Sequence, residues 1–165
     1  MRIYLPATTT TLRALLDAGA VGPPPLTAFA VTPGLREWYV DDDPEELEYA
    51  AMVEAARGSL RLLDAAPEAA RRRVVLAADV PDGDVRVRDD LDRGVVEIGS
   101  VVPLAAVASV HVDDADAEAT VAAAADAVIA ADLGDEPAQE RVDDAEGYEL
   151  SWYATQEIEP WLALL

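Results

Sequence analysis

The chain lacks cysteine and lysine and contains one histidine among its 165 residues. Without cysteine it can form neither a disulfide bond nor a thiolate metal site. The single histidine, His111, likewise excludes a metal centre built from several imidazole rings. No glycine-rich nucleotide-binding motif is present either. We therefore expect no metal and no cofactor.

Long apolar runs are also missing. A membrane-spanning helix needs about 18 or more consecutive apolar residues, and Asp126 interrupts even the alanine-rich stretch 121–131. The first six residues contain no long apolar segment of the kind found in signal peptides. These absences predict a cytoplasmic protein that does not bind membranes.

Negative charge dominates the composition, with a formal net charge of −21. Residues 113–165 hold 15 acidic side chains against Arg141 alone. A field of this sign repels nucleic acids and anionic membranes, so we expect no nucleic-acid partner. It suits solubility, a salty cytoplasm or a basic protein partner.

The length and the hydrophobic fraction of 52% fit one folded domain over residues 1–165. Apolar runs and alternating patterns predict strands, and apolar stripes at intervals of three and four predict helices between them. Crossover helices imply some parallel pairing. We therefore predict an α/β or α+β domain, with a mixed sheet of about five or six strands and helices packed on it. The predicted strands cover 2–5, 26–31, 73–80, 85–88, 95–98 and 108–112.

Local capping signals mark two helices. Thr8 to Thr11 can cap the first, and Gly19 can end it. We read these threonines as a cap rather than a phosphate loop, because the glycines of such loops are missing. Asp43 and Pro44 can begin the second, with Glu46 completing a capping box. Its predicted buried stripe comprises Tyr49, Met52, Val53, Ala56, Leu60 and Leu63.

The carboxy-terminal third is predicted to be mostly helical. Residues 113–131 read as an alanine-rich helix. The acidic stretch 132–147 reads either as a surface helix or as a mobile segment. After it, Leu150, Ala154 and Ile158 recur at helical spacing and predict a last amphipathic helix.

The segments MRIYLPATTTTLRALL, PLTAFAVTPGLREWYV, ELEYAAMVEAARGSLRLL, VVLAADVPD, VPLAAVASVHVDD and YELSWYATQEI resemble a family of short, acidic, uncharacterised actinobacterial proteins. The similarity covers nearly the whole chain. It implies a small bacterial cytoplasmic protein and supplies no active-site residues.

His111 is the first candidate for chemistry because its pKa lies nearest neutrality. Strand alternation places it on one face with Ser109, and Asp113 follows two residues later. Such side chains run parallel at about 7 Å spacing, so we expect no catalytic triad and interpret His111 as a structural or surface residue. The acidic clusters at 41–43, 82–92 and 113–116 do not match a calcium-binding loop.

Aromatic and polar residues form the more informative candidate sites. On the predicted last helix, Glu149, Tyr153 and Gln156 share a face, and Trp152 lies beside it. Trp38 and Tyr39 give a similar mixture near Glu48 and Tyr49. Aromatic rings with polar tips are enriched at interfaces, although they are also common at core boundaries. We predict Trp38, Tyr39, Glu149, Trp152, Tyr153 and Gln156 as binding residues.

Two main functions remain open at this stage, besides mimicry of a nucleic acid by the acidic surface, which the scattering of the acids over several elements disfavours. The first is a non-catalytic binding or regulatory domain that contacts a protein partner or forms a homodimer. The second is a small cofactor-independent hydrolase that uses carboxylates. They differ in whether Glu149 lines a concave pocket with another acid or lies on a flat, exposed face.

Overall fold

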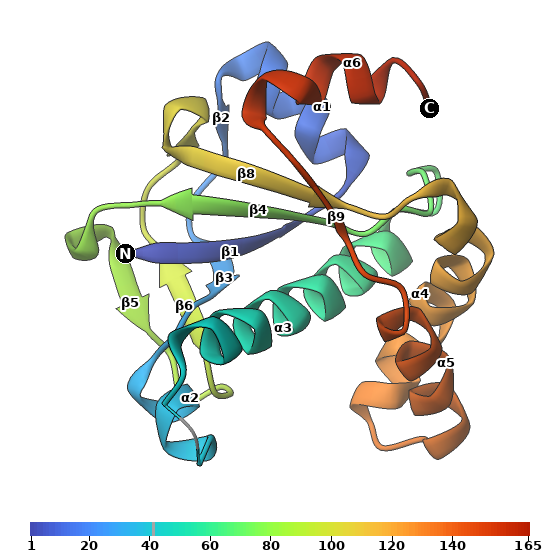
Figure 1. The fold of residues 1–165 in the computed structure, drawn as a ribbon, viewed down its shortest axis with the longest axis horizontal. Coiled ribbons are helices and arrows are strands. Elements are labelled where there is room, and N and C mark those ends of the chain that lie inside the picture. The colour runs from blue at the N-terminus through green and yellow to red at the C-terminus, as the bar shows by residue number, and fades with distance from the viewer. Residues whose placement is uncertain (41) are drawn as a thin grey trace.

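A seven-stranded antiparallel sheet forms the centre of the computed structural model, which describes residues 1–40 and 42–165 (Figure 1). Within this described part the strand order is β5-β6-β3-β1-β4-β8-β9. The strands are β1 (Arg2–Ala7), β3 (Leu26–Phe29), β4 (Val74–Asp79), β5 (Val85–Val87), β6 (Val95–Ile98), β8 (Val107–Val112) and β9 (Ser151–Tyr153). A separate two-stranded ribbon pairs β2 (Ala20–Val21) with β7 (Val102–Pro103).

The predicted fold class is confirmed as a single mixed α and β domain, and two details differ. The main sheet has seven strands instead of five or six, and no pair in the described residues is parallel. The reason is the path of the chain around β1. The connections through α1 (Thr9–Ala18) and α3 (Pro44–Ala65) lead to β3 and β4, which pair with β1 on opposite sides and run against it. These helices therefore do not join parallel neighbours.

Helices cover both faces of the sheet (Figure 1). On one face α1 and α6 (Ile158–Leu162) pack against the large aliphatic side chains of β1 and β4. Thr8 caps α1 by accepting a hydrogen bond from the backbone of Thr11, and Gly19 ends the helix with a positive φ of 76°. The predicted cap and stop of this helix are confirmed.

Helix α3 lies on the opposite face, and Asp43 caps it by accepting from the backbone of Glu45. The predicted buried stripe is right for its second half only. Tyr49 is 59% exposed, and the first half of α3 buries Leu47 and alanines instead. The buried residues of α3 are Leu47, Ala50, Ala51, Ala55, Ala56, Ser59, Leu60 and Leu63. Small side chains let the helix approach the sheet closely, which hydrophobicity alone did not predict.

A helical hairpin of α4 (Glu118–Asp132) and α5 (Glu136–Glu146) packs against the end of α3 through a second, alanine-rich core. The acidic stretch for which a surface helix was one alternative contains α5 and buries Val142 completely. Asp132 binds both Arg57 and Arg61 of α3 at 2.7–3.0 Å. The short α2 (Pro33–Trp38) precedes α3.

The predicted last helix is wrong in its first half. Residues 151–153 form β9, which pairs with β8, and only residues from Ile158 onward form α6. The spacing of Leu150, Ala154 and Ile158 misled the prediction because three residues are too few to display a strand period. Among the described residues, no helix combines the length and apolar character that a membrane span requires.

Candidate functional site

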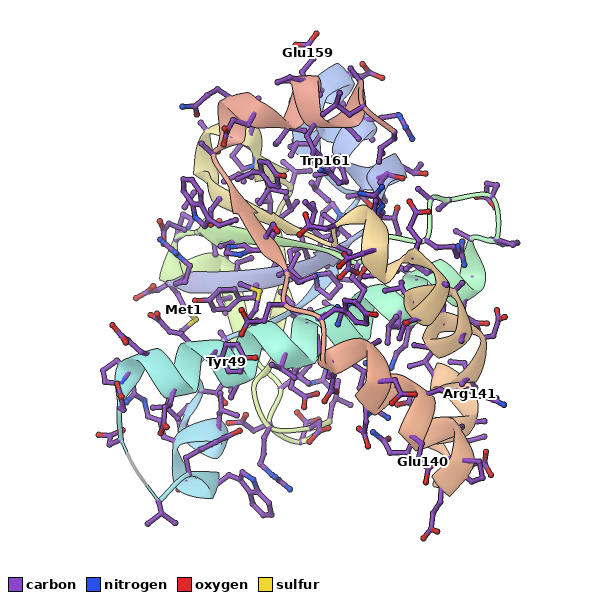
Figure 2. The ribbon with its side chains drawn as sticks, turned by 45° about the vertical axis from the view of Figure 1, so that its right-hand side comes forward. Met1, Tyr49, Glu140, Arg141, Glu159 and Trp161 are labelled. Atoms are coloured by element: carbon purple, nitrogen blue, oxygen red, sulfur yellow. The ribbon has the colours of Figure 1, made fainter. Side chains whose placement is uncertain are left out.

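A cavity of about 360 Å³ lies between α3, the sheet face beneath it and the connection from α5 to β9. Figure 2 shows Tyr49, one of its lining residues, on α3 near the end of the sheet where Met1 begins the chain. The lining residues are Tyr4, Glu45, Glu48, Tyr49, Met52, Val53, Ala56, Arg73, His111, Glu146, Tyr148, Glu149 and Leu150. Three tyrosines, four glutamates and an apolar patch therefore share one site.

The sheet positions the inner wall of the cavity. Tyr4 of β1 pairs with Ala77 of β4, and Val75 of β4 pairs with His111 of β8. Residues two apart on a strand share a face, so Tyr4 and His111 lie on the same side of the sheet. This is the side that α3 covers.

Arg73 closes the inner end of the cavity with a buried ion pair. Its guanidinium donates to both carboxylate oxygens of Asp113 at 2.7 and 2.8 Å and to the carbonyl of Tyr148 at 2.9 Å. Arg73 is 3% exposed, and Asp113 is not exposed at all. The pair fixes the α5–β9 connection against the sheet. Its positive charge is neutralised locally, so it offers little attraction to an anion.

His111 contacts Ser109, which corrects one expectation from the sequence. The distance from Ser109 Oγ to His111 Nε2 is 2.9 Å, so these two side chains do converge. The imidazole ring is long enough to lean along the strand and reach the hydroxyl. The triad is nevertheless absent, because the carboxylate of Asp113 binds Arg73.

Two effects lower the pKa of His111: burial first, then the positive charge of Arg2. The imidazole is therefore mainly neutral at neutral pH. Burial also raises the pKa of Tyr4, and the charge of Glu48 adds to this rise. At neutral pH the inner wall therefore carries little charge on the imidazole of His111 and none on the phenol of Tyr4.

Carboxylates surround this neutral wall. Within residues 1–40 and 42–165, none of Glu45, Glu48, Glu146 and Glu149 forms an ion pair. Partial burial raises the pKa of Glu146, and nearby Asp143 adds to the rise. Arg57 and Arg73 act in the opposite direction, but burial and Asp143 outweigh them. The site therefore gathers carboxylates beside aromatic and apolar surface.

The structure separates the six residues predicted to bind. Glu149 lines the cavity beside three other glutamates, and Trp152 lies opposite His111 at the sheet edge and is 62% exposed. Tyr153 turns to the other face and packs against Trp161 at a centroid distance of 6.3 Å. Gln156 borders a separate hollow near Leu104. The shared helical face is thus wrong, because adjacent residues of a strand point to opposite faces.

The remaining two predicted residues lie at the end of α2. Trp38 stacks beneath the guanidinium of Arg93, which lies 3.5 Å from its ring centroid. Tyr39 lines a second cavity beside Tyr49.

Sequence reasoning missed Tyr4, Tyr148 and Glu146 as site residues. Tyr4 was read only as part of a strand, and Glu146 as part of an acidic surface. The alternation along β1 indicates that Tyr4 faces away from Ile3 and Leu5. Nothing local indicates that α5 ends beside β1 and β8.

The acidic clusters considered for divalent ions take other partners. Asp82 binds the N-terminal amine at 2.9 Å, Asp42 binds Arg36, and Asp43 caps α3. Asp41 lies outside the described residues. In the described part of the chain, no group of three or more histidine, aspartate or glutamate residues is arranged to hold a metal ion.

Comparison with known proteins places the chain in a family. A family model described as "Family of unknown function (DUF6912)" matches residues 1–162. The chain belongs to this family. No match was found among the curated proteins or the solved structures. The DUF6912 match spans all the residues that line the cavity, so the site lies inside the family domain.

Proposed function

We propose that this DUF6912 protein is a non-catalytic binding domain whose cavity accepts a cationic side chain, lysine or arginine, from a protein partner. The observation that carries the proposal is the cavity lining, where four glutamates without ion-pair partners in the described chain stand beside three tyrosines. Aromatic faces and carboxylates together are the usual surroundings of an organic cation.

The size and lining of the cavity support a side chain rather than a large ligand. Ligand pockets typically measure about 300–1,000 Å³, and this one has a volume of about 360 Å³. Met52, Val53 and Leu150 supply an apolar surface for the methylene groups of a lysine or arginine. The carboxylates then meet the charged end.

Trp152 supplies a place for the partner to continue beyond the cavity. Its exposed indole lies beside His111, which lines the cavity, on the same face of the sheet. Exposed tryptophans are frequent binding hot spots. We propose that the protein acts in the bacterial cytoplasm, the location that the sequence resemblance implies.

The experiment compares a short lysine peptide with the same peptide carrying norleucine, which has the same shape and no charge. Isothermal titration at low salt should detect the lysine peptide only. Glu48→Gln and Glu149→Gln should each weaken binding by about 1.4-fold to fivefold, since an ion pair with an exposed carboxylate contributes about 0.2–1 kcal/mol.

Glu140→Gln is the matched control, because Glu140 is exposed on α5 away from the cavity and its loss changes the net charge equally (Figure 2). Equal binding of the norleucine peptide would contradict the proposal. If Glu140→Gln weakened binding of the lysine peptide as much as the cavity variants do, the binding would be a non-specific attraction to an acidic protein.

A carboxylate hydrolase is the second candidate, and the raised pKa of Glu146 favours it. A carboxyl that stays protonated longer than usual can act as a general acid while a neighbouring glutamate stays ionised. Turnover of small glycoside or ester substrates that disappears in Glu146→Gln would favour this function over binding alone.

A further inference from the structure

A second cavity adjoins the first across α3. It is lined by Tyr39, Asp43, Glu45, Glu46, Tyr49, Ala50, Val53 and Glu54. Glu45, Tyr49 and Val53 line both cavities. The two cavities are therefore neighbours that share a wall.

Helix periodicity explains this shared wall. Glu45, Tyr49 and Val53 are spaced four residues apart, so they form one ridge along α3. On one side of the ridge Glu48, Met52 and Ala56 line the first cavity. On the other side Glu46, Ala50 and Glu54 line the second. Each row begins with a glutamate, and the ridge between them carries Glu45 and an exposed tyrosine.

The second cavity repeats the chemistry of the first. Tyr39 and Tyr49 provide aromatic surface, and Ala50 and Val53 provide apolar surface. Neither Glu46 nor Glu54 forms an ion pair within the described residues. A second cation of the same kind therefore fits on the far side of Tyr49.

Resting on the proposed function, we infer that the partner is an extended basic segment that places two cationic side chains, one on each side of Tyr49. In an extended chain, residues two apart point the same way and are about 6.6–6.8 Å apart. Lysine and arginine side chains are long enough to cover the remaining distance into either cavity. The two carboxylate-lined cavities give the charge complementarity that such a segment needs.

Linking two cations on one segment makes the second contact intramolecular, so its effective concentration is high. Two lysines that merely compete for one cavity can improve the affinity only twofold, by statistics. A dibasic segment that fills both cavities should exceed this limit clearly.

The test uses three peptides of equal length, with two lysines separated by one residue, with one lysine and one norleucine, and with two norleucines. The dibasic peptide should bind at least about fivefold more tightly than the monobasic one, given the usual strength of a cation beside an aromatic ring. Glu46→Gln, which lines only the second cavity, should remove most of this gain and weaken binding of the monobasic peptide by no more than about twofold, the statistical cost of losing one of two cavities.

Glu140→Gln again controls for net charge and should preserve the gain. A gain of twofold or less in the unmodified protein would overturn the inference while the proposed function stands. If Glu46→Gln abolished binding of both the monobasic and the dibasic peptide, the inference would also be overturned, because the two cavities would then not act separately. If no lysine peptide binds at all, the proposed function itself fails.

Discussion

At the scale of single residues, His111 gives the most direct measurement. Burial and the charge of Arg2 lower its pKa from 6.5. Its proton resonances in an NMR titration should therefore move with a midpoint below 6.5, and because the chain has one histidine these signals need no assignment. In urea the same signals should return to the ordinary value. A folded-state midpoint at or above 6.5 would contradict the burial argument.

The lowered pKa also links His111 to stability. The unfolded chain binds a proton more readily than the folded chain does, so the neutral imidazole contributes stability above pH 6.5. That contribution is lost as the pH falls through the folded-state pKa. His111→Asn should therefore flatten the pH dependence of the free energy of unfolding in this window.

Residue types alone selected two residues that the structure places at or beside the cavity. Glu149 and Trp152 were selected for their mixture of charge and aromatic surface, and Glu149 lines the cavity while Trp152 lies beside it. The contact of Ser109 with His111 was missed because the spacing of Cα atoms on a strand says little about where long side chains meet. The pairing of Arg73 with Asp113 was missed because 40 residues separate them in the chain.

At the scale of elements, Gly58 sets how closely α3 approaches the sheet. A Cβ atom added to Gly58 would lie 2.7 Å from Cγ and 3.1 Å from Cβ of Pro6, which is held in the central strand β1. On helix propensity alone, Gly58→Ala should stabilise the protein by about 1 kcal/mol. Because neither element can move freely, we expect a net loss of about 1–3 kcal/mol instead.

Denaturant unfolding measures this loss. Ala123→Gly, at an exposed position of α4, is the matched control and should cost about 1 kcal/mol through propensity alone. A more stable Gly58→Ala variant would show that α3 can move away from β1 without penalty.

Element boundaries set by local signals could be predicted, and those set by distant partners could not. Thr8, Gly19 and Asp43 act on the backbone within a few residues, so the ends of α1 and the start of α3 were correct. The three-residue strand β9 forms because it pairs with the edge of β8, and no local sequence pattern indicates that pairing. The cavity could not be predicted for the same reason, because it forms only where α3, β8 and the α5–β9 connection meet in space.

At the scale of the whole molecule, 33 acidic residues face only 12 arginines. Within residues 1–40 and 42–165, eight of the 12 arginines bind acidic side chains or backbone carbonyls, and several of these contacts join elements, such as Arg72 with Glu118 and Arg57 with Asp132. The glutamates along α3 that face the two cavities have no such partner in the described residues. A cation bound where we propose would therefore relieve repulsion among glutamates that form no ion pair.

This repulsion predicts how salt affects stability. A charge of −21 on a domain with a radius of gyration of about 15 Å repels itself strongly at low salt. The Debye length falls from about 30 Å at 0.01 M to about 10 Å at 0.1 M salt, so sodium chloride should raise Tm across this range. The same salt weakens the ion pairs, but exposed ones such as Arg2–Asp79 and Arg36–Asp42 contribute only about 0–1 kcal/mol each. Relief of repulsion should therefore dominate and raise Tm by several degrees, since 1 kcal/mol shifts a domain of this size by about 2–4 °C.

Potassium chloride at equal ionic strength should give the same shift if screening is the cause. A flat or falling Tm would mean that the ion pairs between elements outweigh the repulsion.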